Sequence, residues 1–392
     1  MQAKEHRFVE LATLFLKLGV IGFGGPAAHI SMMEHEVVRR RQWMTSQEFL
    51  DAIGAANLIP GPTSTELVLY IGWLRAGLRG LLVAGFCFIT PAALLSILFA
   101  YLYVRYGTLP SLQPALHGIQ AAVLAIIAAA GWQLARTAAR NVSLVAIGCI
   151  VAAAAAFGLS EIWALLIGGI CGMLWLALHT KAAASKVTGV FVAAMVIMNP
   201  RTLIAAATAS AASIPLHAAV TVPLVKLFLY FLMVGSVLYG SGYVLIAFLE
   251  GWLVNETHLL TRRQLLDAVA VGQFTPGPVS TTATFIGYLL YRWSGAVACT
   301  LGIFLPSFIL VGLLSRYVPK LRSSSWTSHF LDSINAGAVG LILLVTARLG
   351  SENITNWRPA VIALASLTAL LAFRLNATWL VLGGALIGYI WL

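Results

Sequence analysis

Apolar runs about as long as a membrane-crossing helix follow one another along most of this chain. A helix needs roughly 20 consecutive apolar residues to cross the hydrocarbon core of a bilayer. The runs are 8–31, 45–74, 80–104, 114–135, 141–159, 161–179, 222–249, 261–291, 295–315, 331–347, 358–374 and 376–392. Charged residues make up 9% of the 392 residues, whereas soluble proteins carry roughly 25%. We therefore predict an all-α integral membrane protein of about 12–13 hydrophobic segments. A soluble enzyme and a disordered chain are excluded.

Positive charges gather between these runs. Lys and Arg number 24 against 13 Asp and Glu, which gives a formal net charge of +11. Positive loops face the cytoplasm in membrane proteins, and they can also attract an anionic substrate. No dense basic stripe with interleaved aromatic residues is present, so we expect no nucleic-acid partner. We expect a multi-pass protein of the cell inner (plasma) membrane. The clusters are Arg39–Arg41, Arg75 and Arg79, Arg136 and Arg140, and Lys181 and Lys186.

The chain contains two copies of one unit. Pro60-Gly61-Pro62 recurs as Pro276-Gly277-Pro278, 216 residues later. Further pairs at this offset are Gly19 and Gly235, Gly24 and Gly240, Trp163 and Trp379, and Trp175 and Trp391. Rare residue types in step over such a length indicate a duplication. We assign 1–176 to the first copy, 227–392 to the second, and 177–226 to an apolar connector that can cross the membrane once.

The relative orientation of the copies depends on that connector. If each copy holds six crossings, a crossing connector inverts the second copy, as in many transporters, and a non-crossing connector leaves the copies parallel. Some loop charges favour inverted copies and others favour parallel copies. Those that favour inversion are Arg316, Lys320 and Arg322, and those that oppose it are Arg262, Arg263, Arg348 and Arg358. We predict inverted copies.

The first run of each copy is interrupted by glycines. The first copy reads Gly22-Phe23-Gly24-Gly25-Pro26, and the second reads Tyr239-Gly240-Ser241-Gly242. Clustered glycines and a proline break a helix, and a break at membrane depth survives only when it is buried or lines a watery cavity. A half-helix that starts at Pro26 leaves N–H groups free to bind an anion. The candidate ligands are Gly24, Gly25, Pro26, Gly240, Ser241 and Gly242.

The second run of each copy carries the Pro-Gly-Pro motif followed by hydroxyl side chains. Two prolines around a glycine end one helical segment and start another. The hydroxyls then lie beside free backbone N–H groups, which suits a tetrahedral oxyanion. The alternative is a packing kink whose hydroxyls bond to their own helix. The candidate ligands are Pro60, Gly61, Pro62, Ser64, Thr65, Pro276, Gly277, Pro278, Ser280 and Thr281.

Few acidic residues lie in or beside the apolar runs, so each is a candidate for coupling or gating. Glu34 matches Glu250, and Asp51 matches Asp267, whereas Glu66 aligns with a threonine. A gate or a proton-coupling carboxylate is one interpretation. Helix starts and structural salt bridges are the other.

No motif for a metal, a cofactor or an enzyme is present. The chain lacks HExxH, GxSxG, a Walker A loop and a dinucleotide fingerprint, and its cysteines form no CxxC pair. We therefore expect no metal, no cofactor and no enzymatic activity. The cysteines are Cys87, Cys149, Cys171 and Cys299.

The duplicated combination of a Phe-Gly-Gly-Pro break, Glu34, Asp51 and Pro60-Gly61-Pro62 resembles the chromate ion transporter family. The resemblance covers nearly the whole chain as two fused family domains. The second copy departs from it, because Gly-Ser-Gly replaces Gly-Gly-Pro. Membership implies an inner-membrane carrier that expels chromate and confers chromate resistance, with sulfate as a similar ligand.

Export of a dianion needs no coupling ion. Moving one charge across the membrane is worth about 2.3 kcal/mol per 100 mV, and a negative interior drives a dianion outward. We expect alternating access, with the oxyanion held between the copies of a monomer or homodimer in the lipid bilayer. The alternatives are proton-coupled import or exchange of sulfate or another oxyanion through Glu34, Asp51 or Glu66, and an anion channel.

Overall fold

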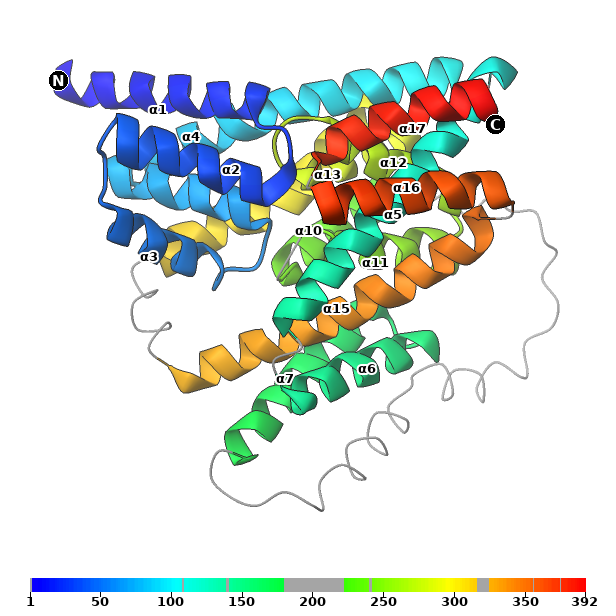
Figure 1. Cartoon of the computed structure of the whole chain (residues 1–392). Coiled ribbons are helices and arrows are strands. Elements are labelled where there is room, and N and C mark those ends of the chain that lie inside the picture. Colours follow the sequence, from blue (N-terminus) through cyan, green and yellow to red (C-terminus); the bar gives the residue numbers. More distant parts are fainter. Residues whose placement is uncertain are drawn as a thin grey trace.

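Every described element of the computed structural model is a helix (Figure 1). The structure describes residues 2–107, 109–138, 141–179, 222–239, 242–315, 324–354, 356–373 and 375–392. The helices of the first copy are α1 (Gln2–Ile21), α2 (Gly25–Glu34), η1 (His35–Arg40), α3 (Ser46–Ala56), α4 (Thr63–Tyr106), η2 (Pro110–Leu112), α5 (Gln113–Ala138), α6 (Val142–Ala156) and α7 (Glu161–His179). Those of the second are α10 (Leu224–Val237), α11 (Val244–Leu249), η3 (Glu250–Glu256), α12 (Arg262–Phe274), η4 (Val279–Thr281), α13 (Thr282–Leu314), α15 (Ser325–Asn353), α16 (Trp357–Phe373) and α17 (Ala377–Trp391).

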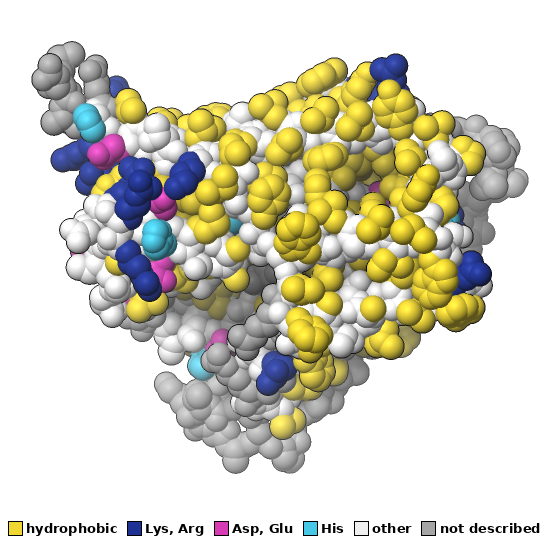
Figure 2. All heavy atoms as spheres, turned by 45° about the horizontal axis from the view of Figure 1, so that its top comes forward, with side chains coloured by type: hydrophobic (Ala, Val, Ile, Leu, Met, Phe, Trp, Pro, Cys, Tyr) yellow, Lys and Arg dark blue, Asp and Glu magenta, His cyan; other side chains and the backbone are white. Residues whose placement is uncertain are grey.

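Membrane-crossing length is present in both copies. Five described helices are long and apolar enough to cross a bilayer, and several shorter apolar helices accompany them. The expected all-α membrane protein is therefore confirmed. Figure 2 shows an apolar surface over much of one face, with Lys and Arg gathered toward the N-terminal end.

The first two runs of each copy reverse direction at their breaks, which the sequence did not predict, and their crossing of the membrane stays a prediction. In the first copy, Lys17 of α1 contacts Glu36 of η1 at 2.7 Å across the glycine break. Phe49 and Ala52 of α3 likewise pack in one cluster with Leu67 and Val68, which follow the Pro-Gly-Pro motif. The breaks are thus the tips of two helical hairpins, because glycine and proline release the chain from helical geometry.

A second reversal lies inside the long helix α4. Ala76 and Gly77 leave helical geometry, and Gly77 has φ 63°. Gly72 packs against the carbonyl of Gly80, which lets the two halves of α4 approach closely. The second copy repeats this turn at Tyr291 and Arg292 of α13. The halves after these turns, 78–106 and 293–314, therefore run on as separate helical segments.

Both loops that open α3 and α12 are fixed by the same local device. Thr45 Oγ1 accepts from the backbone N–H of Glu48, while Glu48 Oε2 accepts from the N–H of Thr45. Thr261 and Gln264 form the same reciprocal pair. This capping box satisfies two N–H groups that the helix leaves free.

The two copies interlock, because each one's α5-type helix packs on the other's last two helices. α5 packs with α16 and α17, and its equivalent α15 packs with α6 and α7. Glycines allow the close approach, since Gly118 of α5 faces Gly384 and Gly388 of α17. On the other side, Gly172 of α7 faces Ser333 of α15.

Equivalent helices run in opposite directions (Figure 1). In the second halves of α4 and α13, Leu81 clusters with Val311, and Gly85 lies against Phe308. As the residue numbers rise along one helix, its contacts in the equivalent helix have falling residue numbers, so the two helices are antiparallel. Helices α5 and α15 are antiparallel in the same way. The prediction of inverted copies is confirmed. The proposed connector 177–226 lies mostly outside the described residues, so its crossing stays a prediction.

Candidate functional site

The helix breaks of the two copies meet each other. The N–H of Gly61 donates to the carbonyl of Leu238 at 2.6 Å, and the N–H of Gly277 donates to the carbonyl of Gly22 at 2.8 Å. These two bonds are equivalent under the 216-residue repeat. Each Pro-Gly-Pro tip therefore rests on the first break of the other copy, and the site is built from both halves.

Glycine is required at these tips for two reasons. Gly61 has φ 139° and Gly277 has φ 92°, a region that side chains rarely adopt. A Cβ at Gly61 would also collide with Glu66 Oε1. Gly24 and Gly25 have φ 107° and 74° and begin α2 with Pro26 in its first turn.

The hydroxyls after the motifs are buried. Ser64, Thr65, Ser280 and Thr281 expose 1% or less of their surface. Thr281 Oγ1 donates to the carbonyl of Pro278 at 3.0 Å, as the packing-kink alternative predicts. Within the described residues, Thr65 Oγ1 and Ser280 Oγ have no hydrogen-bond partner. Gly242 is buried against Val279, and Gly240 and Ser241 lie outside the described residues.

One cavity opens beside the first Pro-Gly-Pro tip. It has a volume of about 540 Å³ and is lined by Asn57, Gly61 and Thr63 of the first copy. Its opposite wall is the start of α15, with Asp332 and Asn335. The start of the long helix α4 therefore faces a polar space between the copies.

A neighbouring cavity opens beside the first glycine break. It has a volume of about 640 Å³, and Gly24 with the first turn of α2 forms one wall. Arg136 and Gln133 of α5 also line it, and Asn376 lies against Gly24. A helix start and a guanidinium both favour an anion. From the sequence, Arg136 belonged to a basic cluster that marks topology or attracts an anion, and it was not among the candidate ligands.

Comparison with known proteins assigns the family. The model of the chromate transporter family matches residues 9–173 and 225–389. The chain belongs to the chromate transporter family. It is 31% identical to a chromate transport protein of Cupriavidus metallidurans, over 99% of this chain and 94% of that protein. It is also 30% identical to a chromate transport protein of Pseudomonas aeruginosa, over 98% and 92% of the two chains. No solved structure matches the chain.

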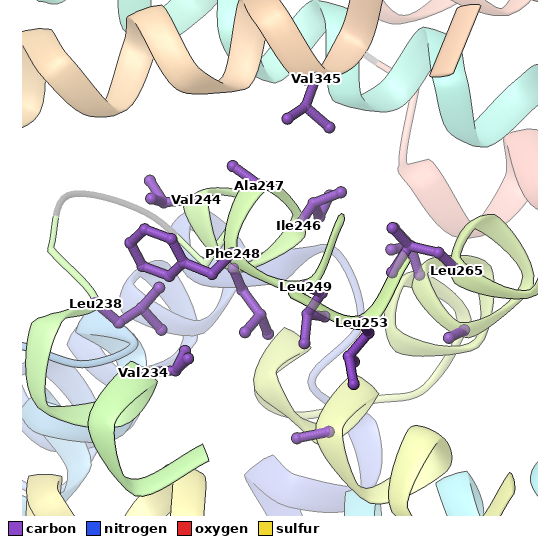
Figure 3. Close-up of a cluster of buried hydrophobic side chains, with 14 of the residues drawn as sticks. Val234, Leu238, Val244, Ile246, Ala247, Phe248, Leu249, Leu253, Leu265 and Val345 are labelled. Carbon is purple, nitrogen blue, oxygen red and sulfur yellow. The ribbon is translucent and has the colours of Figure 1, made fainter. Parts of the chain in front are cut away.

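The two copies of this transporter differ in how tightly the hairpins pack on the long helices. All six residues of α11 are buried. In Figure 3, Ile246 and Ala247 lie on the side of α11 that faces Val345 of α15, and Phe248 and Leu249 point to the opposite side. The equivalent helix α2 is instead separated from α5 by the cavity that Gly24 lines. Likewise α12 packs on α5, whereas α3 and α15 are separated by the cavity that Asn57 lines.

The matched acids occupy different surroundings in the two copies. Glu250 is fully buried and bonds to Arg262 at 3.3 Å and Arg348 at 3.4 Å. Glu34 is half-exposed and pairs with Arg39 at 3.2 Å. The salt-bridge interpretation thus describes the contacts of both, while a gating role stays a prediction.

The aspartates diverge in the same way. Asp267 is buried and accepts from Tyr103 Oη at 2.8 Å and Gln120 Nε2 at 2.9 Å. Both partners belong to the first copy, so these bonds join α12 to α4 and α5. Asp51 is exposed, and its Oδ1 accepts from Gln47 Nε2 at 3.5 Å.

One acid outside the membrane segments is strongly paired. Glu36 of η1 accepts from Lys17 Nζ at 2.7 Å and from Arg40 at 3.1 Å. Burial alone would raise the pKa of Glu36, but the hydrogen bonds and charges of Lys17 and Arg40 outweigh it and lower the pKa. This cluster anchors the end of the first hairpin.

Proposed function

We propose that this transporter exports chromate by alternating access from the cell interior. The observation that carries the proposal is the difference between the copies. The hairpins of the first copy are separated from α5 and α15 by two cavities of about 540 and 640 Å³. In the second copy α11 and α12 pack directly on α15 and α5, and the cavity beside Gly251 and Arg262 is smaller, about 260 Å³. In an alternating-access carrier, equivalent interfaces in the two repeats pack differently, so that one side is open while the other is closed.

The open side is assigned to the cytoplasm from its charge. The first-copy hairpins carry Arg39–Arg41 and Arg75 at the ends away from their breaks, and Arg136 of α5 lines the cavity beside the first break. A Lys and Arg excess marks the cytoplasmic side. Chromate would then enter the cavities from the cell interior.

The oxyanion is held by uncharged donors and one cation. The starts of α2 and α4 supply N–H groups, Thr65 and Ser280 supply hydroxyls, and Arg136 supplies a guanidinium. Export of a dianion down a 100 mV potential gains about 4.6 kcal/mol, twice the value for one charge. No coupling ion is required for that direction.

The proposal is tested by measuring the uptake of labelled chromate into everted membrane vesicles. Ser64→Ala with Thr65→Ala, and separately Arg136→Gln, should cut uptake at least tenfold in protein that is well expressed. Unchanged uptake in both would refute the site. Gain of chromate resistance by expressing cells separates export from import, and non-saturating flux would indicate a channel instead.

A further inference from the structure

A buried carboxyl occupies the first Pro-Gly-Pro tip and has no equivalent in the second copy. Glu66 exposes none of its surface, although it lies in the first turn of α4. The aligned residue of the second copy is Thr282, whose hydroxyl donates to Val279 of its own turn at 2.8 Å. Both copies therefore have a Pro-Gly-Pro tip, but only the tip of the first copy carries a titratable carboxyl, that of Glu66.

Glu66 joins the two copies through one of its oxygens. Ser307 Oγ of α13 donates to Glu66 Oε1 at 2.6 Å. Ser307 has no hydroxyl counterpart in the first copy, because the aligned residue is Ala92. Among the described residues, Glu66 Oε2 has no hydrogen-bond partner, and neither has the adjacent Thr65 Oγ1. The carboxyl lies against Gly61, which lines the first cavity.

No cation compensates this carboxyl within the described chain. Charged groups on the packed elements are engaged elsewhere, since Lys17 pairs with Glu36 and Arg75 pairs with Glu10. The remaining titratable groups on α2, α3, α4 and α13 are His29, Glu34, Glu48, Asp51, Tyr70, Arg79, Cys87, Tyr101, Tyr103, Arg105, Tyr106, Tyr288, Tyr291, Arg292 and Cys299. None of these forms a salt bridge or a hydrogen bond with Glu66. Burying a carboxylate without a cation is costly, whereas a neutral carboxyl can be buried and carries an O–H donor.

We propose that Glu66 acts as a neutral carboxylic acid whose Oε2–H donates a hydrogen bond to the transported oxyanion. This inference rests on the proposed function, because it places the oxyanion at the tip. Ionised Glu66 would repel a dianion held beside it, so one proton binds with each oxyanion. The proton comes from water on the open side and attaches to Oε2. It stays on Glu66 while the oxyanion is released on the other side, and it returns to water on the side from which it came, so it is not a coupling ion. No other bond forms or breaks.

The first experiment measures chromate affinity of the purified full chain as a function of pH, over a range in which chromate stays a dianion. In the wild type, affinity should fall at least tenfold as Glu66 loses its proton. Glu66→Gln keeps a donor that does not titrate, so its affinity should be independent of pH. The matched control is Glu48→Gln, since Gln264 serves the same cap in the second copy. This control should follow the wild type, and a Glu66→Gln profile that does so overturns the proposal.

The second experiment needs no variant. Chromate is added to wild-type protein in weakly buffered solution, and the proton uptake is measured with a pH dye. Uptake approaching one proton per bound chromate on the alkaline side supports the proposal, and no uptake at any pH overturns it. A wild type that transports chromate without proton uptake refutes only the role of Glu66. A wild type that transports no chromate at any pH refutes the proposed function.

Discussion

The two copies of this transporter share a fold but differ in the packing of their hairpins. Helix α11 is fully buried and packs against α15 (Figure 3), whereas α2 and α5 line a cavity. In the second copy Asp267 also bonds to Gln120 of the first copy. One interface is thus present in two arrangements within one chain.

The largest effect is expected where the tips of the two copies touch. Gly61→Ala introduces a side chain at φ 139° that collides with Glu66. Strain and overpacking should together cost about 3 kcal/mol or more of unfolding free energy. Thermal unfolding of the purified protein measures this loss.

Gly25→Ala is the control for that variant, because Gly25 has φ 74° and open space where a Cβ would lie. It should show the strain alone, of about 1 kcal/mol. Equal losses from the two variants would contradict the close contact at the Gly61 tip.

The next-largest difference in unfolding free energy is expected between variants of the matched glutamates. Glu250→Gln removes the carboxylate from Arg262 and Arg348 in a buried cluster, and breaking such a pair costs about 3 kcal/mol. Glu34→Gln breaks a half-exposed pair with Arg39 and should cost about 0–1 kcal/mol. The comparison is made by thermal unfolding, and similar losses would contradict the difference in burial.

A smaller effect should distinguish the copies by pH. Glu36 sits in an ion cluster, while the aligned Trp252 stacks on Tyr230 with ring centroids 4.0 Å apart. Because the pKa of Glu36 is lowered, its stabilisation is present above the usual glutamate pKa and is lost as pH falls through the lowered value. Glu36→Gln should flatten the acid limb of a stability profile, whereas Trp252→Phe should leave its shape unchanged.

The smallest effect concerns the turn inside each long helix. Arg292 takes φ 56° where the first copy has Gly77 at φ 63°. Arg292→Gly should therefore raise unfolding free energy by about 1 kcal/mol, and Gly77→Ala should lower it by a similar amount. Melting temperatures that shift in the same direction would show that the turns are not equivalent.

Much of the architecture was readable from residue types. The duplication, the helix breaks and the inverted copies were predicted, and Gly61 and Gly277 adopt the positive φ that explains their glycines. The fold-back at those breaks was not predicted. Glycine and proline show that a helix ends, but the direction of the next segment depends on contacts such as that of Lys17 with Glu36.

The predicted ligands occupy different surroundings. Thr65 and Ser280 are buried and unpartnered within the described residues, while Thr281 bonds to its own turn. Arg136, which the proposed function adds to the site, was not among the predicted ligands because it lies far along the chain from either break. Only the tertiary structure, in which α5 and α2 line one cavity, brings it near the first break.

The sequence by itself determined the membrane setting, the twofold repeat, the positions of the breaks and the family. The first three follow from composition and from the spacing of residues along the chain, and the family follows from the resemblance of the duplicated motifs. Only the tertiary structure decided that each tip rests on the other copy, as Gly61 does on Leu238. It also decided that Glu66 is buried beside Ser307. The reason is that burial and partners come from residues distant in sequence, and two copies of one pattern can pack in two ways.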